Sequence, residues 1–194
     1  MYVRDARNRD EAWLLDHIEE MGLDEIAFRS RDYVIGIDEE ENERAGFGRV
    51  RVHKTDDGEV CELTSIGVLE EWRSQGVGAH VVERLVKTAS DEGFDVVYAL
   101  TGEPDYLRQF GFEPVEPAQV PERLQDRLTE KQDSLAPDAV PMRIDPDRFR
   151  MPSGLREAFK GARAQTTDEE EEPEEGPEDF GIDPEEATYK YDTG

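Results

Sequence analysis

Two glycines, Gly76 and Gly78, lie in the part of the chain with the clearest capacity for chemistry, residues 68–80, which read VLEEWRSQGVGAH. This segment is predicted to join a strand to the first turn of a helix. Glycine lets the backbone turn tightly and leaves its N–H groups uncovered, and the start of a helix adds a partial positive charge. Together these features predict an anion site suited to a phosphate or a pyrophosphate.

Two better-known phosphate loops do not fit this segment. A P-loop requires G-x-x-x-x-G-K-[ST], and neither Lys-Ser nor Lys-Thr follows Gly76 or Gly78. A dinucleotide fingerprint requires G-x-G-x-x-G, and Val81 occupies the third glycine position. Spacing alone therefore leaves two alternatives open, a phosphate-binding loop of another kind and an ordinary loop that contains glycine.

The elements before the loop read as a helix followed by antiparallel strands. Asp10 is placed to cap a helix with one apolar face, which Gly22 would end. Asp57-Gly58 is typical of a two-residue hairpin turn. The predicted elements are a strand over 2–7, a helix over 11–21, and strands over 33–38, 44–54 and 59–68.

After the loop the pattern changes to helix, then strand. The apolar residues of 78–90 form one helical stripe, and the continuous apolar run 96–100 suits a strand buried on both faces. A strand, helix and strand in succession form a crossover with parallel strands. The remaining predictions are a short helix from Pro104 to Gly111, a strand over 112–115, a helix over 121–135, a strand over 139–144 and a helix over 153–160.

Residues 73–79, RSQGVGA, resemble the [RQ]-x-x-G-x-[GA] signature of the GCN5-related N-acetyltransferases, the GNAT family. The segment Gln109-Phe110-Gly111-Phe112 is similar to the "-LGF" segment of this family, and the resemblance covers about residues 1–145. It implies an α/β fold with a mixed, mostly antiparallel central sheet, a splayed pair of parallel strands and helices on both faces. Nothing in it is specific for a substrate.

The resemblance also implies acetyl-CoA, or another acyl-CoA, as the acyl donor. Family members bind the pyrophosphate on backbone N–H groups of the loop, here Gln75 to Ala79, and lay pantetheine beside the preceding strand, here residues 66–68. A diphosphate needs several fixed donors, and an extended amide arm needs a free strand edge. The implied cofactor-binding residues are Ile66, Gly67, Val68, Arg73, Ser74, Gln75, Gly76, Val77, Gly78, Ala79 and His80.

Glu62 is the candidate general base. The implied reaction is attack of an amine on a thioester carbonyl, with loss of a proton from the amine and an oxyanion that a backbone N–H can stabilise. We expect Glu62 on the same strand face as Val68, roughly 20 Å along the strand at about 3.3 Å per residue, comparable with the reach of pantetheine. The matching position is the general base in histone-type GNAT members. Its physical signature would be a raised pKa, and the alternative is a glutamate on the solvent side of the strand.

Tyr106 is the candidate general acid. The family often places a tyrosine four residues before the glycine of "-LGF", but here that position is Leu107. One helical step is about 100°, so Tyr106 is expected to face differently unless the helix start is shifted. The alternative is a packing residue, since a thiol with a pKa of about 8.5 can leave without a dedicated acid.

Other residues of interest have structural alternatives. Cys61 is expected on the opposite sheet face from Glu62 and therefore in the core. Trp72 is expected to anchor the loop. The resemblance places Phe28, Arg29 and Arg31 at one wall of the acceptor site, where they could read an acidic acceptor. No spacing typical of metal ligands is seen, so no metal is expected.

The charge of the chain limits its partners. With 49 acidic and 23 basic residues the net charge is -26, which disfavours nucleic acid and anionic membranes as partners. Only five of the bases are lysine, a composition that resembles the proteins of salt-in halophiles. The single Cys61, the lack of an apolar run of about 20 residues and the lack of a signal-peptide core predict a cytoplasmic protein.

Three parts are predicted along the chain. Residues 1–150 would form the acetyltransferase domain, 151–167 a helical extension and 168–194 an acidic, disordered tail. The tail carries thirteen acids and one lysine, so about -12 of the charge belongs to it and about -14 to the rest. Its aromatic residues could bind a partner.

The sequence leaves two functions open. One is an N-acetyltransferase that transfers an acetyl group from acetyl-CoA to a primary amine on a small molecule or a protein. The other is a non-catalytic acyl-CoA-binding module, which Leu107 at the usual tyrosine position favours. A homodimer is possible in either case.

Overall fold

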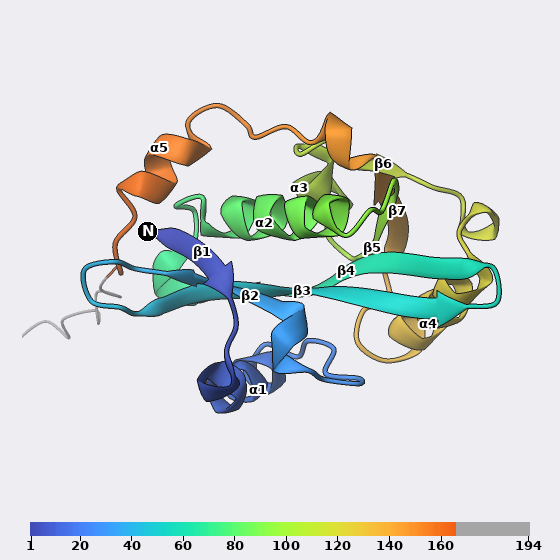
Figure 1. The fold of residues 1–194 in the computed structure, drawn as a ribbon, viewed down its shortest axis with the longest axis horizontal. Helices are drawn as coiled ribbons and strands as arrows, with labels where there is room; N and C mark the ends of the chain where they lie inside the picture. The colour runs from blue at the N-terminus through green and yellow to red at the C-terminus, as the bar shows by residue number, and fades with distance from the viewer. Residues whose placement is uncertain (166–194) are drawn as a thin grey trace, which may run out of the picture.

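The strands form one seven-stranded sheet in the computed structural model, which describes residues 1–165 (Figure 1). The predicted tail over 168–194 lies outside the described residues. In spatial order the strands are β1 (Tyr2–Asp5), β2 (Tyr33–Ile37), β3 (Arg44–Thr55), β4 (Gly58–Val68), β5 (Val97–Thr101), β7 (Val140–Ile144) and β6 (Glu113–Pro114). Only β4 and β5 pair in parallel, and the other neighbours are antiparallel. The predicted mixed, mostly antiparallel sheet is confirmed.

Helices cover both faces of the sheet (Figure 1). α1 (Glu11–Glu20) and α4 (Glu122–Asp133) lie on one face, and α2 (Val77–Asp91) lies on the other with α3 (Pro104–Arg108) and α5 (Leu155–Lys160) beside it. Short 3-10 turns connect them at Asn8–Asp10, Ser30–Asp32, Glu70–Trp72, Pro117–Gln119 and Pro146–Arg148. No helix among residues 1–165 is both long and apolar enough to span a membrane.

The hydrophobic core is divided by the sheet. The apolar stripe predicted for 78–90 is buried against β3, β4 and β5, with Val81, Val82 and Leu85 fully buried. On the other face Leu14 and Ile18 of α1 pack on Phe47. Each such side chain contributes about 1.5–3 kcal/mol through burial. The two clusters hold the ends of β3 and β4 rigidly where the loop begins.

A bulge in β4 decides which way its side chains point. Arg49 of β3 pairs with Thr64 of β4, and Phe47 pairs with Gly67, so β4 holds one extra residue between the two pairs. Ser65, within this bulge, has a φ of +49°. Such a bulge interrupts the alternation of faces.

The bulge separates Glu62 from Val68. Before it Glu62 contacts α4, whereas after it Val68 lies against Gly78 at the start of α2. The expectation that these two side chains share a strand face is therefore wrong, because it assumed uninterrupted alternation.

The parallel pair separates beyond the bulge. β4 and β5 pair only from Cys61 opposite Val97 to Leu63 opposite Ala99. β4 continues to Val68 and β5 to Thr101 without further pairing between them. The predicted splayed pair is thus present, and the edge of β4 that faces β5 is free over its last residues.

Candidate functional site

The glycine loop is held in a conformation that requires its glycines. Gly76 has a φ of +78° at the start of α2, and a Cβ there would lie 2.5 Å from the carbonyl oxygen of Leu155. A Cβ on Gly78 would collide with the hydroxyl of Tyr106. Trp72 is 2% exposed and anchors the loop, as expected. Gly76 is therefore fixed by its backbone conformation and by steric contact, whereas Gly78 is fixed by steric contact alone.

The amides of this loop are available to a ligand. The first helical hydrogen bond of α2 runs from the N–H of His80 to the carbonyl of Gly76 at 3.1 Å. Within residues 1–165, the N–H groups of Gln75 to Ala79 donate to no acceptor. Unpaired donors at a helix start, together with the helix dipole, form an anion site.

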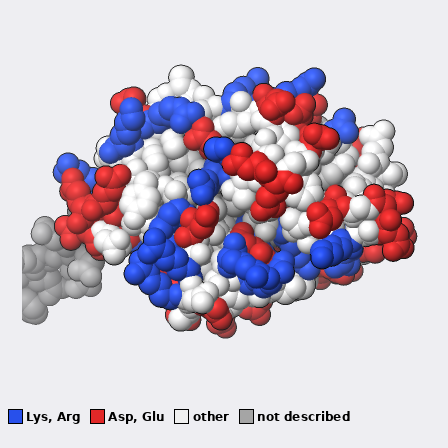
Figure 2. Space-filling view, viewed as in Figure 1, with Lys and Arg blue, Asp and Glu red and all other residues white. Residues whose placement is uncertain are grey.

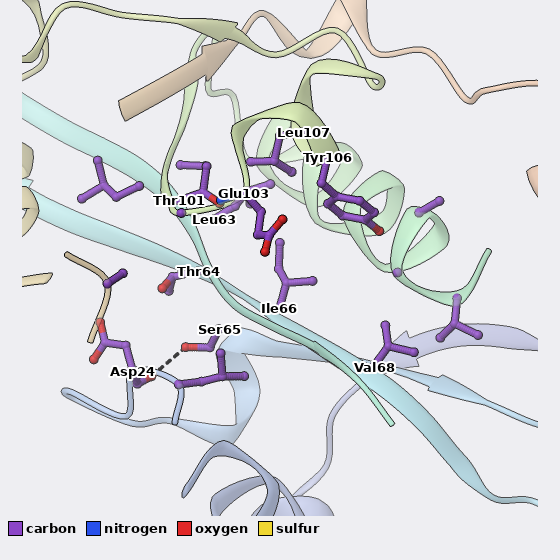
Figure 3. A pocket seen from close by; sticks show the side chains of 18 of the residues that line it. Asp24, Leu63, Thr64, Ser65, Ile66, Val68, Thr101, Glu103, Tyr106 and Leu107 are labelled. Carbon is purple, nitrogen blue, oxygen red and sulfur yellow. Dashed lines mark hydrogen bonds between the residues drawn. The ribbon is translucent and has the colours of Figure 1, made fainter. Parts of the chain in front are cut away.

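A cavity of about 690 Å³ joins this loop to the splayed strands. Its walls come from β4, from the end of β5, from α3 and from the C-terminal part of α4 (Figure 3). The predicted residues that line it are Ile66, Val68, Arg73, Ser74, Gly76, Val77, Gly78, Ala79 and Tyr106. The structure therefore brings together most of the predicted donor-binding residues.

Three predicted donor-binding residues do not line this cavity. Gly67 faces α1, where a Cβ would meet Met21 and Phe47. The side chain of Gln75 donates to the carbonyl oxygens of Glu71 and Arg163 and accepts from the N–H of Arg163. The ring of His80 stacks on Phe159 with 3.9 Å between centroids. α5 and the residues after it thus pack on the outside of the loop.

Glu62 lies behind the cavity wall in a buried network of charges. Its carboxylate is fully buried, accepts a hydrogen bond from Nε2 of His53 at 2.8 Å, and lies 3.4 Å from both Arg127 and Lys131. Burial opposes its charge, but the hydrogen bond from His53 and the positive charges of Lys131 and Arg127 lower its pKa to about 2. The raised pKa expected of a base in the cleft is not found, because three cationic or donor groups surround the carboxylate.

Lys131 links this network to the cavity. Its Nζ donates to Oγ1 of Thr64 on β4 at 3.1 Å and to the carbonyl oxygen of Leu100 on β5 at 3.3 Å. The ammonium group therefore bridges the two strands just beyond the point where their pairing stops. Asp24 also lines the cavity and pairs with Arg127, which completes a layer of buried charges.

Tyr106 lines the cavity together with Leu107. Its ring packs edge-to-face on Phe110 with 5.2 Å between centroids, and its hydroxyl is directed toward Gly78 (Figure 3). The ring is 38% exposed, but burial at the hydroxyl end raises its pKa to about 12. Tyr106, which the helical step led us to expect in a different direction from the usual tyrosine position at 107, thus lines the same cavity as Leu107.

Two residues were missed by the sequence analysis. Glu103 points into the cavity just after the end of β5 (Figure 3). Lys131 lines the cavity from α4. Glu103 had a signal, because ligand sites gather at the carboxyl ends of parallel strands. Lys131 had none, since only the packing of α4 brings it to β4. Within residues 1–165, no group of three or more His, Cys, Asp or Glu side chains is placed to hold a metal ion.

Comparison with known proteins decides the family. The model of the acetyltransferase (GNAT) family matches residues 2–112, more than half of the chain. The chain belongs to the GNAT family. An uncharacterised N-acetyltransferase of Chlorobaculum tepidum is 29% identical over 83 residues, which are 43% of this chain and 54% of that protein. The chain therefore spans about half the length of this curated GNAT relative.

Solved structures agree on the fold. N-acetylglutamate synthase from Neisseria gonorrhoeae, complexed with coenzyme A and N-acetyl-glutamate, matches with a TM-score of 0.57 and 16% identity, over 73% of this chain and 34% of that one. Rv2747 from Mycobacterium tuberculosis, in complex with CoA and NLQ, matches with a TM-score of 0.61 and 16% identity, over 75% of this chain and 99% of that one. At such identity the likeness shows a shared GNAT fold.

Proposed function

We propose that this GNAT protein transfers an acetyl group from acetyl-CoA to a primary amine by direct attack of the amine on the thioester. The observation that carries the proposal is a single cavity that joins the free amides of Gln75 to Ala79 to the opening between β4 and β5. A donor with a diphosphate at one end and an extended amide arm fits these two features. The relatives complexed with CoA support the same donor.

The donor is proposed to bind mainly through the backbone. The pyrophosphate would accept hydrogen bonds from the loop amides, with Arg73 and Ser74 at the rim of the site. The pantetheine arm would follow Ile66 to Val68, where β4 has no partner on the β5 side. The thioester would then lie between the strands, where a free backbone N–H of β4 could stabilise the oxyanion.

Tyr106 is proposed to stabilise the leaving thiolate. With a pKa of about 12 its hydroxyl stays protonated at neutral pH, so it can donate a hydrogen bond to sulfur. A thiol has a pKa of about 8.5, so full proton transfer from Tyr106 to the thiolate is unfavourable by roughly three orders of magnitude. Its role is therefore that of a hydrogen-bond donor, and solvent supplies the proton.

The proton of the amine has two carboxylates as candidate acceptors. Glu62, the candidate from the sequence, is ionised but lies behind the wall and is a weak base at a pKa of about 2. Glu103 points directly into the cavity. We assign the proton-accepting role to Glu103 and retain Glu62 as the alternative, which acts through the buried network. The variants Glu62→Gln and Glu103→Gln test the two candidates. The base is the residue whose variant alone shows reduced turnover with unchanged acetyl-CoA binding.

Titration with acetyl-CoA at molar KCl, followed by release of CoA with a panel of amines, tests the function. Gly76→Asp and Gly78→Asp should weaken acetyl-CoA binding at least about 100-fold, because each places a side chain and a negative charge at the anion site. Gly93→Asp is the matched control, with a φ of +91° and no atom within 4 Å of the position that a Cβ would take.

Two results would overturn the enzyme proposal. Equal binding by wild type, Gly76→Asp and Gly78→Asp would remove the donor site. Binding without turnover on any amine would favour the non-catalytic module instead. The argument for that module from Leu107 is weakened, since Tyr106 lines the same cavity.

A further inference from the structure

A second cavity, of about 460 Å³, lies on the face of the sheet that α4 covers. Six of the nine residues that line it carry basic side chains, and none is acidic; the six are Arg29, Arg49, Arg51, His53, Lys54 and Arg123. The chain as a whole carries a charge of -26. Figure 2 shows that basic side chains nevertheless gather in groups on one face of the molecule. A cavity lined in this way is opposite in sign to the protein that contains it.

Arg51 is the residue in this pocket that most needs a partner. Only 8% of Arg51 is exposed. Its Nη1 is buried and has no hydrogen-bond partner among the described residues. Burial and the positive charges of Arg127 and Arg49 lower its pKa. A buried guanidinium without an acceptor is costly, and it presents a planar fork that matches a carboxylate or phosphate.

The acceptors near Arg51 do not compensate its charge, because they already have other partners. Arg49 donates to the carbonyl oxygens of Ile26 and Ala27 and pairs with Asp32 at 3.2 Å. Glu62 stands opposite Arg51 in the β3–β4 register, but its oxygens contact His53, Arg127 and Lys131. Among the described residues, the Nη1 donor of Arg51 therefore has no acceptor, and Arg51 lines the pocket.

This pocket borders the thioester cavity across one layer of side chains. His53 lines the pocket and lies 2.8 Å from one carboxylate oxygen of Glu62, while Lys131 lines the cavity and lies 3.4 Å from the other. The segment after α1 also spans both, since Asp24 lines the cavity and Ala27 lines the pocket. The pocket is thus one layer of side chains away from the opening between β4 and β5, where the proposed reaction takes place.

We propose that this basic pocket, centred on Arg51, binds the anionic group of the acceptor, so that the substrates are small amines that also carry a carboxylate or a phosphate. The inference rests on the proposed acetyltransferase function and specifies its acceptor. Phe28 and Arg29, expected from the sequence at an acceptor wall, line this pocket, whereas Arg31 does not.

The test compares acceptors that differ in charge but hardly in shape. Release of CoA from acetyl-CoA is measured at one fixed salt concentration with aspartate against asparagine, glutamate against glutamine, and phosphoethanolamine against ethanolamine. We expect kcat/KM to be about 10- to 100-fold higher for at least one acid than for its neutral partner, the range for a lost charge-assisted hydrogen bond. Which pair responds distinguishes a carboxylate from a phosphate.

Variants then assign this preference to the pocket. Arg51→Gln and Arg123→Gln should remove the preference by raising KM for the acid, so that kcat/KM for the acid falls to that for its neutral partner. Arg51→Lys should restore part of it, because it keeps the charge but not the fork. Arg143→Gln, an exposed residue of β7, is the matched control. If Arg51→Gln fails to fold, Arg123→Gln and Lys54→Gln carry the test.

The two proposals fail in different ways. Turnover that is equal for acids and neutral amines, or a preference that survives Arg51→Gln and Arg123→Gln, overturns the acidic acceptor but leaves the acetyltransferase standing. Binding of acetyl-CoA without turnover on any amine overturns the acetyltransferase, and the acceptor assignment falls with it.

Discussion

The two cavities of this protein differ in the groups that they offer to a ligand. The larger one offers the main-chain amides of one short segment, Gln75 to Ala79, as its proposed anion site. Its remaining lining is largely apolar or small. The smaller one presents charged side chains from three separated parts of the chain, the segment after α1, strand β3 and helix α4. A site made of backbone is encoded locally, whereas a site made of side chains depends on long-range register and helix packing.

The layer between the cavities belongs to the second type. Asp24 and Glu62 are distant in sequence from Arg127 and Lys131 of α4, yet the charged groups of all four are buried and in contact. Buried ion pairs add little when complete, but the loss of one partner leaves an uncompensated charge. The comparison thus predicts that this layer governs stability and that the glycine loop governs donor binding.

Replacement of Arg127 should have the largest effect on stability. Arg127→Met leaves Asp24 and Glu62 buried with one cation fewer, so the free energy of unfolding should fall by about 3–5 kcal/mol. Acetyl-CoA affinity of the folded variant should change by less than about threefold, since the donor site is main chain. Urea unfolding and acetyl-CoA titration measure the two quantities.

The control for Arg127 is an exposed pair. Lys87 lies 2.9 Å from Asp91 on the surface of α2, and Lys87→Met should change stability by less than about 1 kcal/mol. A loss below about 1 kcal/mol in Arg127→Met would show that the charged layer is not a stabilising unit. A large loss of acetyl-CoA affinity in the folded variant would instead show that the two regions are coupled.

Much of the donor side could be read from the sequence, because its signals are local. Each predicted strand and helix is present with ends that differ by at most three residues, and the loop joins β4 to α2 as expected. Hydrophobic periodicity and the glycine positions are properties of short segments. The predicted strand face of Glu62 was wrong because of the bulge at Ser65. No glycine marks this bulge, since it is a serine that adopts the φ of +49°.

Apart from Phe28 and Arg29, the proposed acceptor side could not be read from the sequence, for the opposite reason. Arg127 follows Glu62 by 65 residues and contacts it only because α4 packs on the sheet below β4. Arg49 and Arg51 read simply as alternating strand residues. Their shared pocket appears only when β3, α4 and the segment after α1 are brought together.

The pH dependence of stability should report on Glu62. Its folded pKa of about 2 lies below its ordinary value of 4.5, so its ionised form stabilises the fold above about pH 4.5, and this contribution is lost as the pH falls toward 2. Glu62→Gln should therefore cost about 3 kcal/mol at pH 7, and the difference from wild type should shrink below about pH 4.5. Urea unfolding of both proteins between pH 7 and pH 3 measures this difference.

Glu103→Gln provides the comparison from the other region. Glu103 is exposed in the donor cavity and forms no ion pair with another described residue, so this variant should leave the free energy of unfolding within about 0.5 kcal/mol of wild type. A difference between wild type and Glu62→Gln that stays constant down to pH 3 would mean that the carboxylate of Glu62 is not held by its cations in solution.

Tyr106 offers the smallest and most specific test, because its hydroxyl is proposed to act through a single hydrogen bond in the donor cavity. Tyr106→Phe removes only the hydroxyl that faces Gly78, so kcat should fall about 3- to 10-fold, the value of one hydrogen bond to the departing sulfur. Tyr98→Phe, on β5 but outside the cavity lining, is the matched control and should change kcat by less than about twofold.

The pH profile separates a hydrogen-bond donor from a true general acid. With a pKa of about 12, Tyr106 remains protonated throughout pH 6–10. The pH profile of kcat for wild type should therefore have no falling limb in that range that is absent from the profile of Tyr106→Phe. Such a limb would show that the hydroxyl ionises at much lower pH in the complex and acts as a proton donor. Unchanged kcat in Tyr106→Phe would show that the thiolate leaves without a hydrogen bond from this hydroxyl, and Glu103 would then be the one side chain proposed to act chemically in the donor cavity.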